Sequence, residues 1–500
     1  MKPLKEILKE VNVEEIYGDL DIFIEGITEN SKEIKKGFLF VAKKGVKTSG
    51  EEFIEEAINN GAIAILKEPP IIPKKDVCQI IVKDVKEEMG KVALNFYDNP
   101  EKKLFLIGIT GTNGKTSTAF FLKQAFENLG IKAGYIGTIC YDIGKRLPSK
   151  ETTPSIIELA KLLNMIVAHK GRVCVLEVSS HALSQKRLSN LKFEIAGFTN
   201  LSRDHLDYHK TMENYYQSKK LLFTSHLVNK GKAVISLETP WGERLAEELK
   251  KERKDVEIIF TNYKDFEVLV EGRENGLLLK VKKKNKEWLL KINAIGDFQR
   301  FNIGVALAIL MSFAKRENLK KSEKEIISAF SNVSPPEGRL ELVTTHNKAL
   351  FVVDYAHTPD ALKFSLLGVR PWVKNRLILV FGCGGERDKG KRPLMAKVAE
   401  ELADIVIVTS DNPRREDPFA IIKDIISGFE KEKPIVIVDR KEAIKEAVKI
   451  AQPGDVVLIA GKGHETYQQI GDKRIPFSDK EEVLKAIRNM KEGVRVEYRK

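Results

Sequence analysis

The sequence predicts an α/β protein with three domains: a central domain with a phosphate-binding loop (P-loop) on a parallel sheet, a smaller domain before it and a Rossmann-like domain after it. Three observations predict this fold class. A glycine-rich run follows one apolar strand, near-continuous apolar strands alternate with helical segments, and polar residues gather where those strands end.

The glycine-rich run is the most specific of these features. It reads Gly108-Ile109-Thr110-Gly111-Thr112-Asn113-Gly114-Lys115-Thr116 and directly follows the apolar residues 104–107. A strand that ends in such a turn and opens a helix cradles phosphate, because backbone N–H groups approach the anion, Lys115 adds charge and Thr116 offers a hydroxyl to Mg²⁺. Ile109 stands where the common P-loop has another glycine. We predict a helix over 118–129 that stops at Gly130.

Length and composition limit the class of protein. The 500 residues suggest about three domains, and a hydrophobic content of 42% is sufficient for buried cores. No stretch approaches the roughly 18 apolar residues of a transmembrane helix, and the first residues do not form a signal peptide. The four cysteines are scattered without a CxxC pair, which indicates buried thiols in a reducing cytoplasm rather than a disulfide framework or a zinc site.

The net charge of +13 raises the question of nucleic-acid binding. The 84 Lys and Arg residues are largely interleaved with the 71 Asp and Glu residues, as in 247–252, and no basic patch carries aromatic residues. This pattern favours a solvated surface with many ion pairs over a nucleic-acid interface. An anionic substrate is a further use for the positive balance.

We expect the domains to span residues 1–96, 97–334 and 335–500, with Pro335-Pro336 as a hinge. The second domain alternates strands and helices, except in residues 255–295. There, short strands with polar turns at 272–275 and 283–286 predict an antiparallel insert.

The third domain restarts the alternation of strands and helices. Its strands are almost entirely apolar, as expected for a sheet covered on both faces, and we place them at 351–354, 377–382, 405–409, 435–439 and 456–461.

In the central domain, polar residues follow two strands. The strand 172–177 ends in Glu177, and an acid at a strand tip facing a P-loop is a natural Mg²⁺ ligand. The strand 194–200 is followed by a loop rich in ionisable residues, 201–209. His205 and His209 lie four apart there, but no third soft ligand is near in sequence, so Mg²⁺ and phosphate chemistry is preferred to zinc.

In the third domain, four more loops after strands combine glycines with charged residues. Arg387 and Arg414 suit a carboxylate, because a guanidinium group binds it with two parallel hydrogen bonds. Asp411 and Glu465 suit an ammonium group. A ligand with both groups is an amino acid.

Several of these motifs together resemble the Mur ligases of peptidoglycan synthesis, over essentially the whole chain. The motifs are 110–116, 200–209, Glu337-Gly338-Arg339, 354–359 and Gly461-Lys462-Gly463-His464-Glu465. Within this family, the chain is most similar to the type that completes the muramyl tripeptide. Asp411-Asn412-Pro413-Arg414 is what that type shows when it adds meso-2,6-diaminopimelate, and lysine-adding relatives usually lack the Arg.

The resemblance implies a reaction and its participants. ATP, with Mg²⁺, transfers its γ-phosphate to the D-Glu carboxylate of UDP-N-acetylmuramoyl-L-Ala-D-Glu. The amine of diaminopimelate attacks the resulting acylphosphate, and phosphate leaves from a tetrahedral intermediate. Positioning and charge neutralisation supply most of the catalysis in such a phosphoryl transfer. We expect a cytoplasmic monomer that neither binds nucleic acid nor inserts into a membrane.

The resemblance also implies residue roles. Catalytic roles fall to Lys115, His205 and Lys219, with Lys219 carbamylated; Thr116 and Glu177 hold one Mg²⁺, and His205 and Lys219 lie by the second. The ATP contacts are Gly111, Thr112, Asn113, Gly114, Lys115, Thr116 and Ser117, with Asn302 at the adenine, Arg339 at the phosphates and Asp354 at the ribose. The UDP-sugar-peptide contacts are Ser31, Thr152, Thr153, Ser179, Gln185 and Arg187, and the amino-acid contacts are Arg387, Asp411, Asn412, Arg414, Gly461 and Glu465.

Three alternatives stay open. The same ligase could use lysine. A different amide ligase of the superfamily, such as the D-Ala-D-Ala-adding Mur ligase, folylpolyglutamate synthase or a cyanophycin-type enzyme, is opposed by the segments 152–154 and 411–414. A non-catalytic P-loop binding protein or regulatory ATPase would turn over ATP without forming an amide, and it leaves the charged loops of the third domain unexplained.

Overall fold

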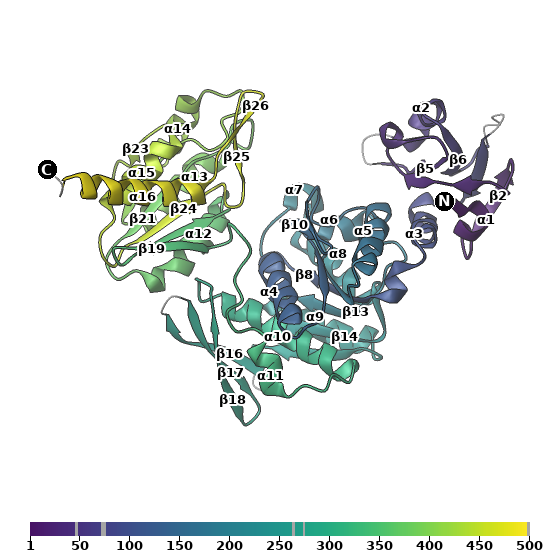
Figure 1. Cartoon of the computed structure of the whole chain (residues 1–500), viewed down its shortest axis with the longest axis horizontal. Helices are drawn as coiled ribbons and strands as arrows, with labels where there is room; N and C mark the ends of the chain where they lie inside the picture. The colour runs from purple at the N-terminus through teal and green to yellow at the C-terminus, as the bar shows by residue number, and fades with distance from the viewer. Residues whose placement is uncertain (46–48, 72–76, 263–265, 274–275, 498–500) are drawn as a thin grey trace. The chain divides into compact units, whose positions relative to one another are not determined.

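The computed structural model of the chain describes residues 1–45, 49–71, 77–262, 266–273 and 276–497. It comprises two compact units: residues 1–267 with 301–330, and residues 268–300 with 331–500. Figure 1 labels the helices and strands of the chain. The three domain boundaries given above stay a prediction. The α/β fold class is confirmed by the sheets of both units.

The first unit opens with a five-stranded sheet in the order β2-β7-β6-β5-β4. The strands β4 to β7 are parallel, and β2 pairs antiparallel with β7. The elements of this segment are β1 (Lys2–Pro3), α1 (Leu4–Ile7), β2 (Val13–Tyr17), β3 (Phe23–Ile24), β4 (Gly26–Thr28), β5 (Phe38–Val41), α2 (Ile54–Asn59), β6 (Ala62–Lys67), β7 (Cys78–Val82) and α3 (Val85–Phe96).

The same unit contains the eight-stranded central sheet, in the order β11-β10-β9-β12-β8-β13-β14-β15. The six strands from β9 to β15 in this order are parallel, and β10 and β11 extend the sheet antiparallel at one edge. Its strands are β8 (Phe105–Thr110), β9 (Ala133–Ile136), β10 (Cys140–Asp142), β11 (Arg146–Pro148), β12 (Val173–Glu177), β13 (Phe193–Phe198), β14 (Leu227–Ser236) and β15 (Glu257–Thr261). Its helices are α4 (Lys115–Asn128), α5 (Ile156–Ala168), α6 (Ser180–Ser184), α7 (Leu206–His209), α8 (Met212–Thr224), α9 (Pro240–Glu252), α10 (Gln299–Arg316) and α11 (Glu323–Ser328).

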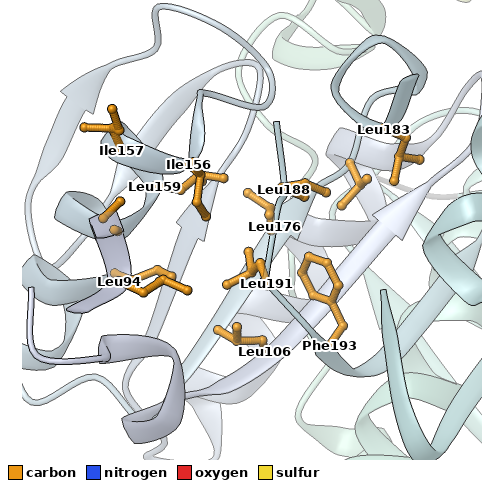
Figure 2. Close-up of a cluster of buried hydrophobic side chains, with 14 of the residues drawn as sticks. Leu94, Leu106, Ile156, Ile157, Leu159, Leu176, Leu183, Leu188, Leu191 and Phe193 are labelled. Atoms are coloured by element: carbon orange, nitrogen blue, oxygen red, sulfur yellow. The ribbon is translucent and has the colours of Figure 1, made fainter. Parts of the chain in front are cut away.

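Apolar packing fixes the positions of β8 and β12, the two strands that lead into the phosphate loop and to Glu177. Every residue of β8 and β12 is buried, as their continuous apolar sequences require. Leu106 of β8 and Leu176 of β12 lie in one cluster with Leu94 of α3 and Leu159 of α5 (Figure 2). The core of the central sheet therefore includes the helix that ends the first 96 residues. Burying each such side chain contributes roughly 1.5–3 kcal/mol.

The second unit is built on a six-stranded sheet in the order β19-β20-β24-β21-β22-β23. The five strands from β20 to β23 are parallel, and β19 is an antiparallel edge. Its elements are β19 (Glu341–His346), β20 (Ala349–Asp354), α12 (Pro359–Val369), β21 (Leu377–Phe381), α13 (Lys391–Leu402), β22 (Ile405–Val408), α14 (Pro418–Ile426), β23 (Ile435–Val436), α15 (Arg440–Ile450), β24 (Val456–Ala460), β25 (Tyr467–Ile470), β26 (Lys473–Pro476) and α16 (Asp479–Glu497).

Most predicted elements are present, with three corrections. The strand predicted at 435–439 is the two-residue edge strand β23, and its residues are exposed rather than covered on both faces. The helix after the P-loop begins at Lys115, three residues earlier than predicted, because the loop itself closes the first helical turn. The predicted insert at 255–295 is antiparallel only in part. β15 pairs parallel with β14 inside the central sheet, since its apolar residues 258–260 extend that sheet.

The remainder of the insert is the sheet β16 (Phe266–Arg273), β17 (Leu277–Lys283) and β18 (Lys286–Ile292), with β17 and β18 antiparallel. Its predicted turn at 283–286 is present, and residues 274–275 of the other turn lie outside the described residues. No helix in the described part of the chain is long and apolar enough to span a membrane.

Candidate active site

The phosphate loop lies between β8 and α4 and packs on the end of β13. A Cβ at Gly111 would stand 1.9 Å from the Thr199 hydroxyl, and one at Gly114 would stand 2.2 Å from Asn302 Oδ1. Both glycines also have positive φ angles, +152° and +81°. Other residues are therefore excluded at both positions by space and by backbone conformation. The predicted adenine contact Asn302 lies directly against the loop.

Two side chains from the end of β13 hold the loop. The Asn113 N–H donates to Asn200 Oδ1 at 2.9 Å, and the Thr199 hydroxyl donates to the Asn113 carbonyl at 2.6 Å. Lys115 folds back over the loop, where its Nζ donates to the carbonyls of Gly111 and Thr112, each at 2.9 Å. The loop is thus ordered by its own sheet, and the lysine lies over the cradle.

Glu177 lies at the tip of β12, next to the loop, and its exposed fraction is 0%. The Thr116 hydroxyl donates to its Oε2 at 2.8 Å, and Thr138 donates to both of its oxygens, each at 3.1 Å. The hydroxyl of Tyr135 donates to Oε1. A buried carboxylate with hydrogen bonds to both oxygens is held in one orientation, which suits a cation beside the phosphate loop.

Tyr135 and Thr138 were not predicted from the sequence to belong to the site. They lie at and beyond the end of β9, a neighbour of β12 in the parallel sheet. Burial and the adjacent Glu177 raise the pKa of Tyr135 well above its usual value, so the phenol stays a donor.

Lys219 is on α8 and its exposed fraction is 2%. Its Nζ donates to the Gly111 carbonyl at 2.6 Å and lies 4.5 Å from the centre of the Tyr215 ring. Burial, and then the nearby Lys115, hold the pKa of Lys219 well below its usual value. The structure thus brings the lysine predicted to be carbamylated to the phosphate loop.

Lys220, the next residue, points elsewhere. It forms ion pairs with Glu248 at 2.8 Å and Glu252 at 2.6 Å on α9. The two adjacent lysines therefore have separate environments, one at the loop and one in an ion-pair network with α9.

His205 precedes α7 with a left-handed backbone, φ 52°. Its Nε2 is 3.4 Å from Asp204, and its ring packs edge-on against His181 and within 6.0 Å of Tyr215. Tyr215 also reaches the Thr112 hydroxyl at 3.2 Å. His205 is thus joined to the phosphate loop through Tyr215.

The predicted peptide contacts gather at the ends of β12 and α5. The Thr153 hydroxyl donates to the Glu177 carbonyl at 2.7 Å and accepts from the Ser179 N–H at 3.0 Å. Thr152 meets Thr138 at 3.1 Å between hydroxyls. Three of the five predicted residues thus connect to the strand that carries Glu177 or to its neighbour β9, whereas Arg187 bonds to Thr153 and Gln185 contacts Arg187.

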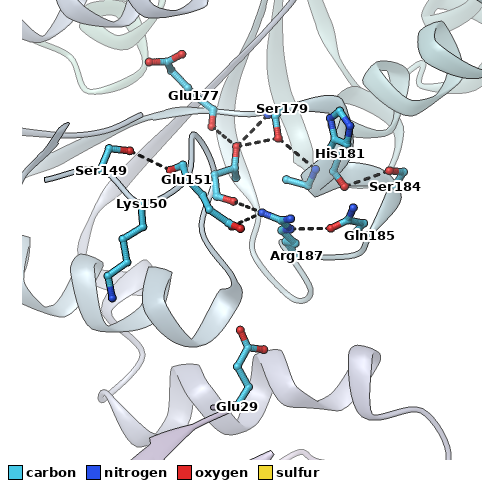
Figure 3. A network of polar contacts seen from close by, with 12 residues as sticks. Glu29, Ser149, Lys150, Glu151, Glu177, Ser179, His181, Ser184, Gln185 and Arg187 are labelled. Carbon is cyan, nitrogen blue, oxygen red and sulfur yellow. Dashed lines mark hydrogen bonds and ion pairs between the residues drawn. The ribbon is translucent and has the colours of Figure 1, made fainter. Parts of the chain in front are cut away.

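Arg187 is held by three acceptors: Gln185 Oε1 at 2.9 Å, the Thr153 carbonyl at 3.1 Å and the Glu151 carboxylate (Figure 3). Arg187 also lines a cavity of about 220 Å³. The other lining residues are Glu29, Lys43, Lys44, Gly45, Lys86, Met89, Glu151, Ser155, Ile156, Gln185 and Lys186. Lysines from the first 96 residues therefore face the peptide contacts across this cavity, where they suit an anionic ligand.

Ser31, the predicted uridine contact, is buried in the amino-terminal sheet region. Its hydroxyl donates to Glu56 Oε2 at 2.6 Å, and its carbonyl accepts from Asn60 at 3.0 Å. It does not line the cavity described above.

In the second unit, Asp354 orders the loop that carries Arg339. The carboxylate of Asp354 accepts from the Leu340 N–H at 2.7 Å, the Ala356 N–H at 2.9 Å and the Ser365 hydroxyl at 2.7 Å. The Arg339 guanidinium lies 5.0 Å above the Tyr355 ring, and its Nε is buried without a hydrogen-bond partner. A guanidinium group with an unsatisfied buried N–H suits an anionic ligand such as phosphate.

The predicted amino-acid contacts also converge in this unit. Asn412 Nδ2 donates to Glu465 Oε2 at 2.9 Å, and a Cβ at Gly461 would stand 2.6 Å from Asp411 Oδ2. The Gly461 N–H also donates to the carbonyl of Asp354 at the end of β20, at 3.1 Å. The ends of β20, β22 and β24 therefore meet at one edge of the sheet, as expected for parallel strands.

Arg414 has a left-handed backbone, φ 53°. Its N–H donates to the Gln469 carbonyl at 3.1 Å, and its Nη1 donates to the Gly385 carbonyl at 2.7 Å. The hairpin β25–β26 therefore fixes the backbone of Arg414, and the loop after β21 orients its guanidinium group. Arg387, in that same loop, is exposed.

The residues around the phosphate loop offer few ligands for a metal ion. In the described ranges, no group of three or more His, Cys, Asp or Glu residues could hold a metal. Mg²⁺ does not require such a group, because it keeps waters and takes one or two carboxylates plus phosphate oxygens. Thr116 and Glu177 supply hard oxygen donors at the phosphate loop and fit that ion.

Family profiles match three segments of the chain. They are described as the Mur ligase family catalytic domain at residues 23–97, the Mur ligase middle domain at 109–310 and the Mur ligase glutamate ligase domain at 338–463.

Curated relatives match almost the full length. A protein of Clostridium acetobutylicum named UDP-N-acetylmuramoyl-L-alanyl-D-glutamate--2,6-diaminopimelate ligase 1 is 40% identical over 97% of this chain and 99% of its own. The ligase of that name from Aquifex aeolicus is 43% identical over 94% and 96%.

A solved structure titled as a UDP-N-acetylmuramoyl-L-alanyl-D-glutamate--2,6-diaminopimelate ligase shares 32% identity over 98% of this chain and 99% of its own, with a TM-score of 0.71. With full-length relatives at this level of identity, the chain belongs to the Mur ligase family.

Proposed function

We propose that this Mur ligase joins meso-2,6-diaminopimelate to UDP-N-acetylmuramoyl-L-Ala-D-Glu, with ATP as co-substrate. The observation that carries the proposal is the cluster of Asn412, Arg414 and Glu465 after the parallel strands of the second unit. It offers carboxylate and ammonium partners to one amino acid, which a simple ATPase does not need. The names of the relatives at 40% and 43% identity support the same substrates.

The phosphate loop binds and orients ATP. Its amides and Lys115 surround the phosphates, and the Nζ hydrogen bonds that Lys115 now makes to two loop carbonyls are replaced by contacts to phosphate oxygens. Thr116 and Glu177 would hold one Mg²⁺, and a carbamate on Lys219, with His205 near it, would support a second. Mg²⁺ supplies neutralisation of the charge on the transferred phosphoryl group.

The chemistry proceeds in two steps. A D-Glu carboxylate oxygen attacks the γ-phosphorus and ADP leaves, which gives an acylphosphate. The unprotonated amine of the acceptor then attacks the acyl carbon, phosphate leaves with the carboxylate oxygen, and the nitrogen loses a proton. No covalent enzyme intermediate is needed, so the protein acts through positioning and charge.

Each substrate has a set of residues in the structure. Arg187, with Thr153 and Ser179 beside it, faces the cavity suited to the anionic nucleotide-sugar peptide. Asp411, Asn412 and Glu465 bind the amino and carboxyl groups of the acceptor, and Arg414 binds its second carboxylate. Arg339 and Asp354 act at the phosphates and ribose of ATP.

We also propose that the protein works in the cytoplasm as a monomer. All four cysteines are free and buried, which is compatible with a reducing compartment.

A parallel substrate panel tests the proposal. The protein is incubated with ATP, Mg²⁺ and UDP-N-acetylmuramoyl-L-Ala-D-Glu, together with diaminopimelate, L-lysine, D-lysine or L-ornithine. Phosphate release is measured beside amide product by mass spectrometry. We expect equal amounts of phosphate and amide, with diaminopimelate the best acceptor. Phosphate without amide would indicate an ATPase, and a preference for lysine would contradict the assigned acceptor.

A further inference from the structure

Lys462 has no role in the function proposed above, yet it is a fully buried charge beside the acceptor residues. It lies between Gly461 and Gly463, whose φ angles are +119° and +54°. A Cβ at Gly463 would stand 2.7 Å from the Tyr355 Cβ, so the chain can follow this path only with glycine there. The two glycines turn Lys462 inward, and the exposed fraction of its side chain is 0%.

The Lys462 ammonium group lies among acceptor-site residues. Its Nζ donates to Asn412 Oδ1 at 3.0 Å and to Glu465 Oε2 at 2.9 Å, and it is 4.0 Å from Asp411 Oδ1. The centre of the Tyr467 ring lies 5.6 Å from the Lys462 Nζ. One positive charge is therefore shared by three side chains that are proposed to bind the acceptor.

These contacts determine which way the Asn412 amide points. Its Oδ1 accepts from Lys462 Nζ and from the Gln469 N–H at 2.8 Å. Both partners can only donate, so the oxygen must face them and the NH₂ group must face Glu465. Asn412 Nδ2 donates one hydrogen to Glu465 Oε2, which leaves a second hydrogen to offer to a ligand.

Glu465 is oriented in the same way. Its Oε2 accepts two hydrogen bonds, one from Lys462 and one from Asn412, and its side chain is 19% exposed. A donor on Asn412 and an acceptor on Glu465 therefore lie side by side, which complements the carboxylate and ammonium groups of an amino acid.

We propose that Lys462 is a positioning residue of the acceptor site: it fixes the Asn412 amide and the Glu465 carboxylate in the orientation that binds the amino acid. The inference rests on the proposed ligase function. Without Lys462, two neighbouring carboxylates, Asp411 and Glu465, lose their buried cation, and Asn412 can rotate its amide. Lys462 itself stays out of contact with substrate.

The test compares Lys462→Met with wild type. We measure KM for diaminopimelate, ATP and UDP-N-acetylmuramoyl-L-Ala-D-Glu separately. Loss of a charged hydrogen bond that orients the site should raise the KM for diaminopimelate about ten-fold or more, while the other two KM values change by less than about two-fold. Lys462→Gln keeps a neutral donor, so its increase should be smaller, and this variant decides the question if Lys462→Met does not fold.

Two controls separate positioning from general damage. Lys397→Met removes another lysine of the same unit, ion-paired with Glu430 at 2.7 Å on the surface, and should leave all three KM values unchanged. In an Asn412→Ala background, the effect of Lys462→Met on the KM for diaminopimelate should shrink, because the two residues act together.

Several outcomes would overturn the inference. They are an unchanged or lower KM for diaminopimelate in both Lys462 variants, equal increases in all three KM values, or effects of Lys462→Met and Asn412→Ala that simply multiply. If wild type forms no amide with any acceptor, the proposed function fails first. If wild type forms amide and the variants show no acceptor effect, only the role of Lys462 fails.

Discussion

The hydroxyl of Thr116 donates to the carboxylate of Glu177 at 2.8 Å, which joins the first turn of α4 to the tip of β12. β12 and β8 are adjacent parallel strands, with Glu177 beside Ile109 in register. The pairing therefore brings an acid to a phosphate loop that lies about 60 residues earlier in the chain.

Lys115→Ala should abolish ligation and leave the fold intact. Lys115 lies over the phosphate loop, and losing a charge-assisted phosphate contact removes several kcal/mol of transition-state stabilisation, or roughly 100-fold or more in rate. The check is ligation rate beside thermal unfolding, with the exposed Lys132→Ala as control. Activity within a few-fold of wild type in a folded Lys115→Ala protein would refute the assignment of the loop.

Lys219→Ala should be nearly inactive and partly rescued by short carboxylic acids. The proposed carbamate supplies oxygen ligands next to the loop, and a small carboxylate can replace them. Ligation is measured with and without added acetate or formate.

Lys220→Ala is the matched control, because Lys220 pairs with Glu248 and Glu252 of α9 and not with the phosphate loop, so this variant should retain activity. Wild-type activity of Lys219→Ala, or an unmodified Lys219 in a crystal structure of the enzyme, would contradict carbamylation.

Arg414→Ala should remove the preference for diaminopimelate over L-lysine. Lysine lacks the second carboxylate and would leave the guanidinium group without a carboxylate partner. Sites built around a polar group reject analogues that lack it by as much as ~10⁴-fold. The measurement is kcat/KM for both acceptors in both proteins.

Arg415→Ala serves as the control for Arg414, because Arg415 is exposed and pairs with Asp472 at 2.8 Å. It should keep the wild-type preference. A wild type that favours lysine, or a preference that survives in Arg414→Ala, would show that Arg414 does not select the acceptor.

Glu194→Gln should stabilise the protein above neutral pH. Burial raises the pKa of Glu194 on β13 from 4.5 to about 7. The folded protein therefore binds a proton more tightly than the unfolded chain, and this group lowers stability as the pH rises from about 4.5 to about 7. The cost above pH 7 is up to about 3 kcal/mol.

Urea unfolding at pH 5 and pH 8 measures this effect. The gain in unfolding free energy of Glu194→Gln over wild type should be larger at pH 8 than at pH 5. In wild type, the Leu106 N–H donates to the Glu194 carboxylate at 2.7 Å. In Glu194→Gln, the side-chain amide oxygen can still accept this hydrogen bond. Equal differences at the two pH values would contradict the raised pKa.

The sequence by itself determined the fold class and much of the candidate site. The phosphate loop is formed by consecutive residues, so its glycines, Lys115 and Thr116 can be identified from one short stretch of sequence. Glu177 and the loops of the second unit were identifiable because functional residues follow the carboxyl ends of parallel strands. Apolar strands that are buried on both faces, such as β8 and β12, showed where those ends fall.

Tertiary structure decided which side chains support those residues. Tyr135 reaches Glu177 only because β9 pairs with β12, and Lys462 reaches Asn412 only because β24 and β22 end at the same edge of their sheet. Neither contact has a local signature, since the partners are 42 and 50 residues apart. Likewise, β15 resembled the start of an antiparallel insert, and its pairing with β14 made it part of the parallel sheet. Several apolar segments that are far apart in the sequence could pair with one another. Which of them pair depends on how they pack in the folded protein, and the sequence of one segment alone does not determine it.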